Sequence, residues 1–229
     1  MLKDQRGNIV YWVLSGILAI AVIFLLVLSI RANLDPKKNA DNCITSMQKI
    51  WVAVRDYVTD TQKDFDGNLN VLRNTQKPNS KTNYLGEEKY CPESRGKKDE
   101  YMVMGRLMTY EVSYTDTTGV EDVVRTSIEK VVGIMVLCPN LKQFAAHDIP
   151  QAFYDNQIAN RFQSRINSDI AQLKERAGNN PLAKYESMLA YFNFWKNTKL
   201  TDFDECTKTP EYRKIMNISE PVEGEETEE

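Results

Sequence analysis

The sequence predicts an α+β protein with an N-terminal transmembrane stem helix, an amphipathic helix packed on a small antiparallel sheet, and a C-terminal helical appendage. Three observations predict this class. Ile9–Ile30 is a run of 22 residues without a charge. Apolar residues then recur at spacings of three and four over residues 43–58, which is typical of an amphipathic helix. Residues 101–137 are rich in alternating β-branched and aromatic side chains, as strands are, and helical spacing returns in the last third.

The uncharged run is long enough to cross a membrane. A helix that rises about 1.5 Å per residue over residues 9–30 spans the hydrocarbon core, which is roughly 30 Å thick. A secretory signal has an apolar region of only about 7–15 residues and ends at a small-residue cleavage site. This run ends with Ile30 and Arg31 instead. We therefore expect residues 1–8 to form a short tail and residues 9–30 to stay in the lipid bilayer.

The cysteines decide the expected orientation, because positive charges are nearly balanced on the two sides of the run. All four cysteines follow the membrane segment: Cys43, Cys91, Cys138 and Cys206. An even, dispersed set without C-x-x-C pairs favours disulfides in an oxidising compartment, and four cysteines allow three connectivities. The alternative is four free buried thiols in a domain that faces the cytosol. We expect the tail in the cytoplasm and the bulk of the chain outside it.

A helix is expected soon after the membrane segment. Asp35-Pro36 breaks the stem helix, and Asp41 or Asn42 is a plausible N-cap of the next one. Its apolar face contains Ile44, Met47, Ile50, Trp51, Val54, Tyr57 and Val58. The stretch that begins at Asp64 reads Asp-x-Asp-Gly-Asn, as a calcium loop does, but Thr75 stands where such a loop needs its closing Glu. An ordinary Asp-Gly turn is therefore the preferred interpretation.

Strands and further helices complete the expected order. Tyr101–Tyr114 and Val120–Leu137 predict two to four antiparallel strands, with VVGIMVLC as the most buried stretch. Together with the amphipathic helix they form an α+β domain over residues 39–148. Apolar spacing from Phe153 to Leu173 and from Leu182 to Trp195 predicts two helices, separated by AGNNP, in an appendage over residues 149–218. Residues 219–229 are acidic and are expected to be disordered.

The sequence contains no recognisable catalytic motif. His147 is the only histidine, so any triad with an imidazole base depends on it. A Cys138–His147 pair is conceivable, but nothing in the sequence favours it. A zinc site of thiolates lacks close ligand pairs, and no glycine-rich phosphate loop is present. The chain also has no basic stripe or aromatic platform for nucleic acid. We predict a protein that is not an enzyme and that uses no metal or cofactor.

Three segments resemble a known family. Lys3 and Arg6-Gly7 directly precede the apolar run, CITSMQKIWVAVRDYVTD follows it, and YLGEEKYCPESRGKKDEYMV comes before the first expected strand. In this order and spacing they resemble the type IV pilin-like superfamily, which includes the pseudopilins of type II secretion. The likeness covers roughly residues 3–105.

The resemblance implies a function and a processing site. A prepilin peptidase would cut between Gly7 and Asn8, and the chain would be a subunit of a type IV pilus or a type II secretion machine in a bacterial inner membrane. Its partners would be other pilin-like subunits and inner-membrane assembly proteins. Stems of this family usually carry Glu at the fifth position after the cut, where this chain has Trp12. Tip-capping minor pseudopilins also lack that Glu, so the resemblance implies a minor member.

The resemblance also implies a disulfide pairing. It puts Cys43 beside Cys91, as does a helix laid across the sheet, and this leaves Cys138 to hold the appendage through Cys206. Two other functions stay open at this point. The first is a single-pass, membrane-anchored extracytoplasmic binding module that does not polymerise, and the more distant one is an anchored hydrolase.

Overall fold

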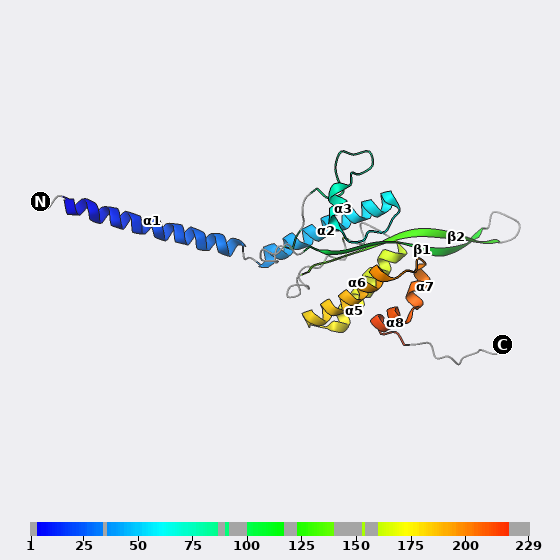
Figure 1. Ribbon diagram of the computed structural model, residues 1–229. Helices are drawn as coiled ribbons and strands as arrows, with labels where there is room; N and C mark the ends of the chain where they lie inside the picture. Colours follow the sequence, from blue (N-terminus) through cyan, green and yellow to red (C-terminus); the bar gives the residue numbers. More distant parts are fainter. Residues whose placement is uncertain are drawn as a thin grey trace. The chain divides into compact units, whose positions relative to one another are not determined.

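The computed structural model describes residues 4–33, 36–86, 90–91, 100–116, 123–139, 153 and 160–219. The chain divides into two compact units, Met1–Asp41 and Asn42–Glu229, which are described separately. The predicted α+β class with a small antiparallel sheet is confirmed, since the described residues form several helices and one two-stranded sheet (Figure 1). Residues 220–229 of the predicted acidic tail 219–229, and His147, lie outside the described residues.

The first unit is dominated by one helix. Helix α1 runs over Asp4–Asn33, and the next helix begins at Pro36; Asp35 of the predicted break lies outside the described residues. The large apolar side chains from Tyr11 to Val27 are 45–80 % exposed within the chain. Among the residues described, no helix combines the length and the apolar character needed to cross a membrane.

The sheet of the second unit is one long hairpin. Strands β1 (Met102–Asp116) and β2 (Val123–Leu137) pair antiparallel, from Met102 opposite Leu137 to Asp116 opposite Val123. These bounds lie close to the predicted ones. Burial is concentrated where β1 begins and β2 ends, so the predicted most buried stretch, residues 131–138, is confirmed.

Each face of the hairpin packs against helices. On one face, Val103, Ile134 and Val136 join the core formed by α2 (Pro36–Thr61). On the other face, Met104, Met108 and Met135 join the core formed with α5 (Arg161–Ala177) and α6 (Pro181–Asn197). Figure 1 shows α2 on one side of the hairpin and α5 and α6 on the other. Neighbouring residues of a strand point to opposite faces of the sheet. Since helices cover both faces here, apolar residues occupy both sets of strand positions.

The connection between α2 and the hairpin contains the predicted turn. Gly67 has a φ of +96°, which favours glycine, and the Asp66 side chain accepts a hydrogen bond from the Asn68 amide at 2.9 Å. The Asp64 carboxylate accepts from the Leu107 amide of β1 at 2.8 Å. Asn68 then caps the short helix α3 (Leu69–Asn74). The acidic side chains of this stretch therefore satisfy backbone donors.

Four helices form the layer on the second face of the hairpin. They are α5 (Arg161–Ala177), α6 (Pro181–Asn197), α7 (Phe203–Lys208) and α8 (Pro210–Met216). Helix α5 starts after the cap residue Asn160 rather than at Phe153. The AGNNP stop is confirmed, since Gly178 ends α5 and Asn180 caps α6. These helices share one core with the hairpin, so they form a third layer of the second unit.

Candidate functional site

Helix α1 presents an apolar surface on every side. Consecutive residues from Tyr11 to Leu14 each expose more than half of their side chains, and the pattern continues to Val27. Since a helix completes a turn in 3.6 residues, such a run covers its whole circumference. Gly7 and Asn8, the predicted cleavage site, lie in α1 as well, and Trp12 is 75 % exposed. This surface is a candidate for contact with lipid or with other apolar helices.

Three of the four cysteines come together in the core of the second unit. Helix α2 contributes Cys43, Cys91 follows the bridge between Tyr90 and Glu100, and Cys138 directly follows β2. The Cys138 Sγ lies 3.2 Å from the Cys91 Sγ and 3.5 Å from the Cys43 Sγ. All three sulfurs lie within 4.8 Å of one another, and the residues are at most 2 % exposed. We call Cys43, Cys91 and Cys138 the three-cysteine group.

The surroundings of the three-cysteine group raise the pKa of Cys43. A hydrogen bond with Cys138 lowers the pKa of Cys43, but a hydrogen bond with Cys91 and burial raise it, and the net value is about 12. The Tyr101 hydroxyl donates to the Cys43 Sγ at 3.3 Å, and burial raises the pKa of this phenol far above its usual value. Because the thiolate is the nucleophile, the raised pKa of Cys43 makes it a slow nucleophile at neutral pH.

Cys206 does not belong to the three-cysteine group. It lies in α7, is fully buried in the core between the hairpin and the C-terminal helices, and donates to the Leu200 carbonyl at 3.8 Å. All four cysteines are thiols in this structure. The fold therefore brings Cys43 and Cys91 together, as the resemblance implies, and adds Cys138 to them. The predicted pairing of Cys138 with Cys206 stays a prediction.

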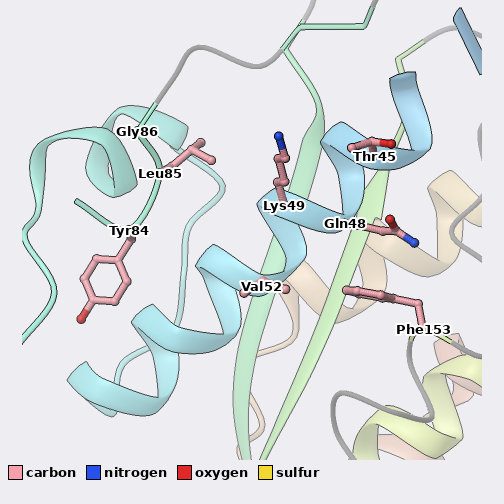
Figure 2. Close-up of a pocket in the computed structure, with 8 residues that line it drawn as sticks. All are labelled: Thr45, Gln48, Lys49, Val52, Tyr84, Leu85, Gly86 and Phe153. Carbon is pink, nitrogen blue, oxygen red and sulfur yellow. The ribbon is translucent and has the colours of Figure 1, made fainter. Parts of the chain in front are cut away.

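A pocket of about 570 Å³ lies on the outer side of α2. Its lining consists of Thr45, Gln48, Lys49, Val52, Tyr84, Leu85, Gly86 and Phe153. Figure 2 shows the α2 residues between Leu85 and Gly86 on one side and the Phe153 ring on the other. Phe153 is held edge-on against Trp51, with ring centroids 5.2 Å apart. The sequence did not predict this pocket, because its lining comes from three segments that are far apart in the chain.

A buried carboxylate connects the C-terminal helices. The Asp169 side chain accepts hydrogen bonds from the Tyr191 hydroxyl at 2.7 Å and from the Tyr212 hydroxyl, and it pairs with the Arg165 Nε at 3.0 Å. Burial raises the pKa of Asp169, and the two tyrosine bonds and Arg165 act against that rise. The arrangement joins α5, α6 and α8. It pairs the buried Asp169 carboxylate with two hydroxyls and a guanidinium.

Comparison with known protein families, with characterised proteins and with solved structures finds no match for this chain.

Proposed function

We propose that this chain is a membrane-anchored, pilin-like structural subunit, of the minor pilin or pseudopilin type, in a type IV pilus or a type II secretion machine. Its second unit lies outside the cytoplasm of a bacterial cell, and its N-terminal tail lies inside. The observation that carries the proposal is α1, a helix of 30 residues whose apolar side chains from Tyr11 to Val27 are exposed all around.

An all-round apolar helix needs apolar surroundings. In water, the exposed side chains of α1 cost free energy in proportion to their area, and lipid tails remove that cost. Other apolar helices in the middle of a filament do the same. Ser15, Gly16, Ala19 and Ala21 are small residues that permit close helix packing. A Cβ atom added at Gly16 would meet nothing within 4 Å, so this position is open to a neighbouring helix.

The arrangement of the second unit supports the same proposal. The resemblance implies an amphipathic helix across a small antiparallel sheet, and the apolar face of α2 packs on one face of the hairpin. It also implies that Cys43 and Cys91 are neighbours, and their sulfurs lie within 4.8 Å of each other. Trp12 in place of the usual Glu supports a minor subunit, because no stem carboxylate is available to pair with another subunit's freed amine.

One observation favours the second candidate, an anchored extracytoplasmic binding module that does not polymerise. The pocket beside α2 has the volume of a small-molecule site and combines apolar walls with the Lys49 ammonium. Under this alternative, α1 is an uncleaved anchor and the pocket is the functional surface.

N-terminal processing separates the two candidates. We would express the full chain in cells with an active prepilin peptidase, and in matched cells whose peptidase is inactive, and measure its intact mass. The pilin-like proposal expects the chain to begin at Asn8 in the first cells and at its original N-terminus in the second. Retention of Met1 in both would overturn the proposal in favour of the anchored module.

A pair of glycine variants controls for the effect of substitution on α1 itself. Gly7→Val should block cleavage, because a peptidase that requires glycine before the cut has no room for a side chain. Gly16→Val lies in the same helix, where an added Cβ meets nothing within 4 Å, and should leave cleavage unchanged. Equal cleavage of both variants would contradict the assignment of Gly7.

A further inference from the structure

The three-cysteine group holds one sulfur more than a disulfide needs. We propose that it is a thiol–disulfide exchange site, in which Cys138 forms a disulfide with either Cys91 or Cys43 and the third cysteine remains a thiol that can exchange into the bond. This inference does not depend on polymerisation, and it gives Cys138 a partner other than Cys206.

The geometry brings Cys138 close to two competing partners. Its Sγ lies 3.2 Å from that of Cys91 and 3.5 Å from that of Cys43. A disulfide bond is about 2.05 Å long, so either pair closes after a relative movement of roughly 1–1.5 Å. The three residues come from α2, from the segment beside Tyr90 and from the end of β2, so each bond joins different parts of the core.

The proposed reaction has two steps, formation of a disulfide and its exchange. In the first, the Cys138 thiol and one neighbouring thiol together lose two protons and two electrons to an external disulfide, which is reduced to two thiols. In the second, the third cysteine loses its proton and its thiolate attacks the Cys138 Sγ. The first S–S bond breaks, and the sulfur that leaves takes up a proton, so this step consumes no oxidant.

A bound metal ion is a poorer fit to the same three sulfurs. Structural zinc takes four ligands from Cys, His and carboxylates, and the group contains three such residues among those that the structure describes. Three thiolates around a divalent ion leave a net negative charge where the residues are at most 2 % exposed, which is costly. A disulfide together with a thiol is neutral.

The two bonds have different structural consequences. A Cys43–Cys138 bond fastens α2 to the end of β2, across 95 positions of the chain. A Cys91–Cys138 bond fastens the segment beside Tyr90 to the same strand end, across 47 positions. Exchange therefore moves the covalent link to the strand end from α2 to the segment beside Tyr90. The number of disulfides does not change.

Disulfide mapping of the full chain tests this proposal. The chain in detergent micelles would be oxidised with glutathione disulfide, with a trace of reduced glutathione, quenched in acid, alkylated in denaturant and digested without reduction. We expect about one disulfide per chain, divided between Cys91–Cys138 and Cys43–Cys138, with Cys206 alkylated. The ratio of the two links should be independent of protein concentration, because exchange is intramolecular.

Three single variants give the matched comparison. Cys91→Ser should move the whole population to the Cys43–Cys138 link, Cys43→Ser should move it to the Cys91–Cys138 link, and Cys206→Ser should leave the wild-type ratio unchanged. The wild-type map needs no variant, so a variant that fails to fold does not remove the test. The proposal is overturned by a dominant Cys43–Cys91 or Cys138–Cys206 link, by a single unvarying Cys138 link, by four thiols that resist oxidation, or by one bound zinc ion per chain.

Discussion

Gly105 of β1 lies in direct contact with Val54 of α2: a Cβ atom built at Gly105 would fall 2.5 Å from the Val54 Cγ1. On the other strand and the other face, a Cβ atom at Gly133 would fall 2.3 Å from the Phe162 Cε1 of α5. These distances are shorter than real Cβ contacts. The two glycines therefore permit a helix to approach the hairpin closely from each side.

Alanine at either glycine should destabilise the second unit. We expect Gly105→Ala and Gly133→Ala each to lower the free energy of unfolding by about 1–3 kcal/mol, because the added methyl group overpacks a core that is already full. Chemical denaturation measures the loss. Gly86→Ala is the matched control, since a Cβ there meets nothing within 4 Å. Val54→Ala should recover part of the loss in Gly105→Ala but none in Gly133→Ala, and equal recovery in both would contradict this account.

Arg106 joins β1 to the end of α6. Its guanidinium donates to the carbonyl oxygens of Trp195 at 2.8 Å and Leu200 at 3.0 Å, and also to that of Thr198. The side chain is 7 % exposed and lies 3.6 Å from the Asp64 carboxylate. One planar group with several N–H donors thus satisfies carbonyls in the last turn of α6 and just after it.

Replacement of Arg106 should therefore be costly. Arg106→Met leaves several carbonyls without their donor. We expect this variant to lower the free energy of unfolding by about 3–5 kcal/mol. Arg106→Lys keeps the charge, but an ammonium cannot reach all the carbonyls at once. Its free energy of unfolding should therefore lie between those of wild type and Arg106→Met. Arg125→Met is the control, because the Arg125–Asp116 pair is 59 % exposed on the arginine side and should contribute less than about 1 kcal/mol. Equal losses at both positions would contradict the assigned role.

Periodicity predicted the long elements of this fold well. The spacing of Met47, Ile50 and Val54 identifies the face of α2 that enters the core, and proline and glycine signals mark the ends of α1 and α5. These predictions succeed because each depends on neighbours within one or two turns. Helices α7 and α8 have six and seven residues, which is too short for an apolar period to be recognised.

Contacts between distant segments could not be predicted in the same way. Met104 and Val103 are both apolar, so the sequence shows a buried strand but not which helix covers each face. The same limit applies to the candidate sites. Cys43 and Cys138 are 95 positions apart, and only the packing of α2 against the end of β2 brings their sulfurs to 3.5 Å. The pocket beside α2 likewise depends on the place of Phe153 next to Trp51.

Removal of the N-terminal segment should leave the second unit folded. The core against α2 begins at Cys43, and the second unit begins at Asn42. We expect a chain that starts at Asn39 to be a soluble monomer with cooperative thermal unfolding, by light scattering and circular dichroism. The full chain should require detergent and, in cells that contain the machine, co-purify with other membrane subunits. An aggregated or unfolded short chain would contradict the prediction.

Lys174 is half-buried near the end of α5, and burial and the nearby charge of Lys184 lower its pKa from 10.5 to about 8. The unfolded chain therefore binds more protons than the folded chain between pH 8 and pH 10.5. Since stability rises with pH wherever the unfolded state holds more protons, this lysine makes the fold less stable below pH 8 than above pH 10.5.

Methionine at this position should remove that penalty while it keeps much of the aliphatic packing. We expect Lys174→Met to raise the free energy of unfolding at pH 7 by about 1–3 kcal/mol, from the value of about 1.4 kcal/mol per pKa unit. The gain over wild type should shrink as the pH rises from about 8 to 10.5, because wild-type Lys174 then becomes neutral in both states. Denaturation curves at several pH values measure this difference directly.

Lys184→Met is the control variant. It removes only the neighbouring charge, so it should give a smaller gain in the free energy of unfolding over the same pH range. A gain at Lys174 that stays constant with pH would show that packing, rather than the buried ammonium, is responsible.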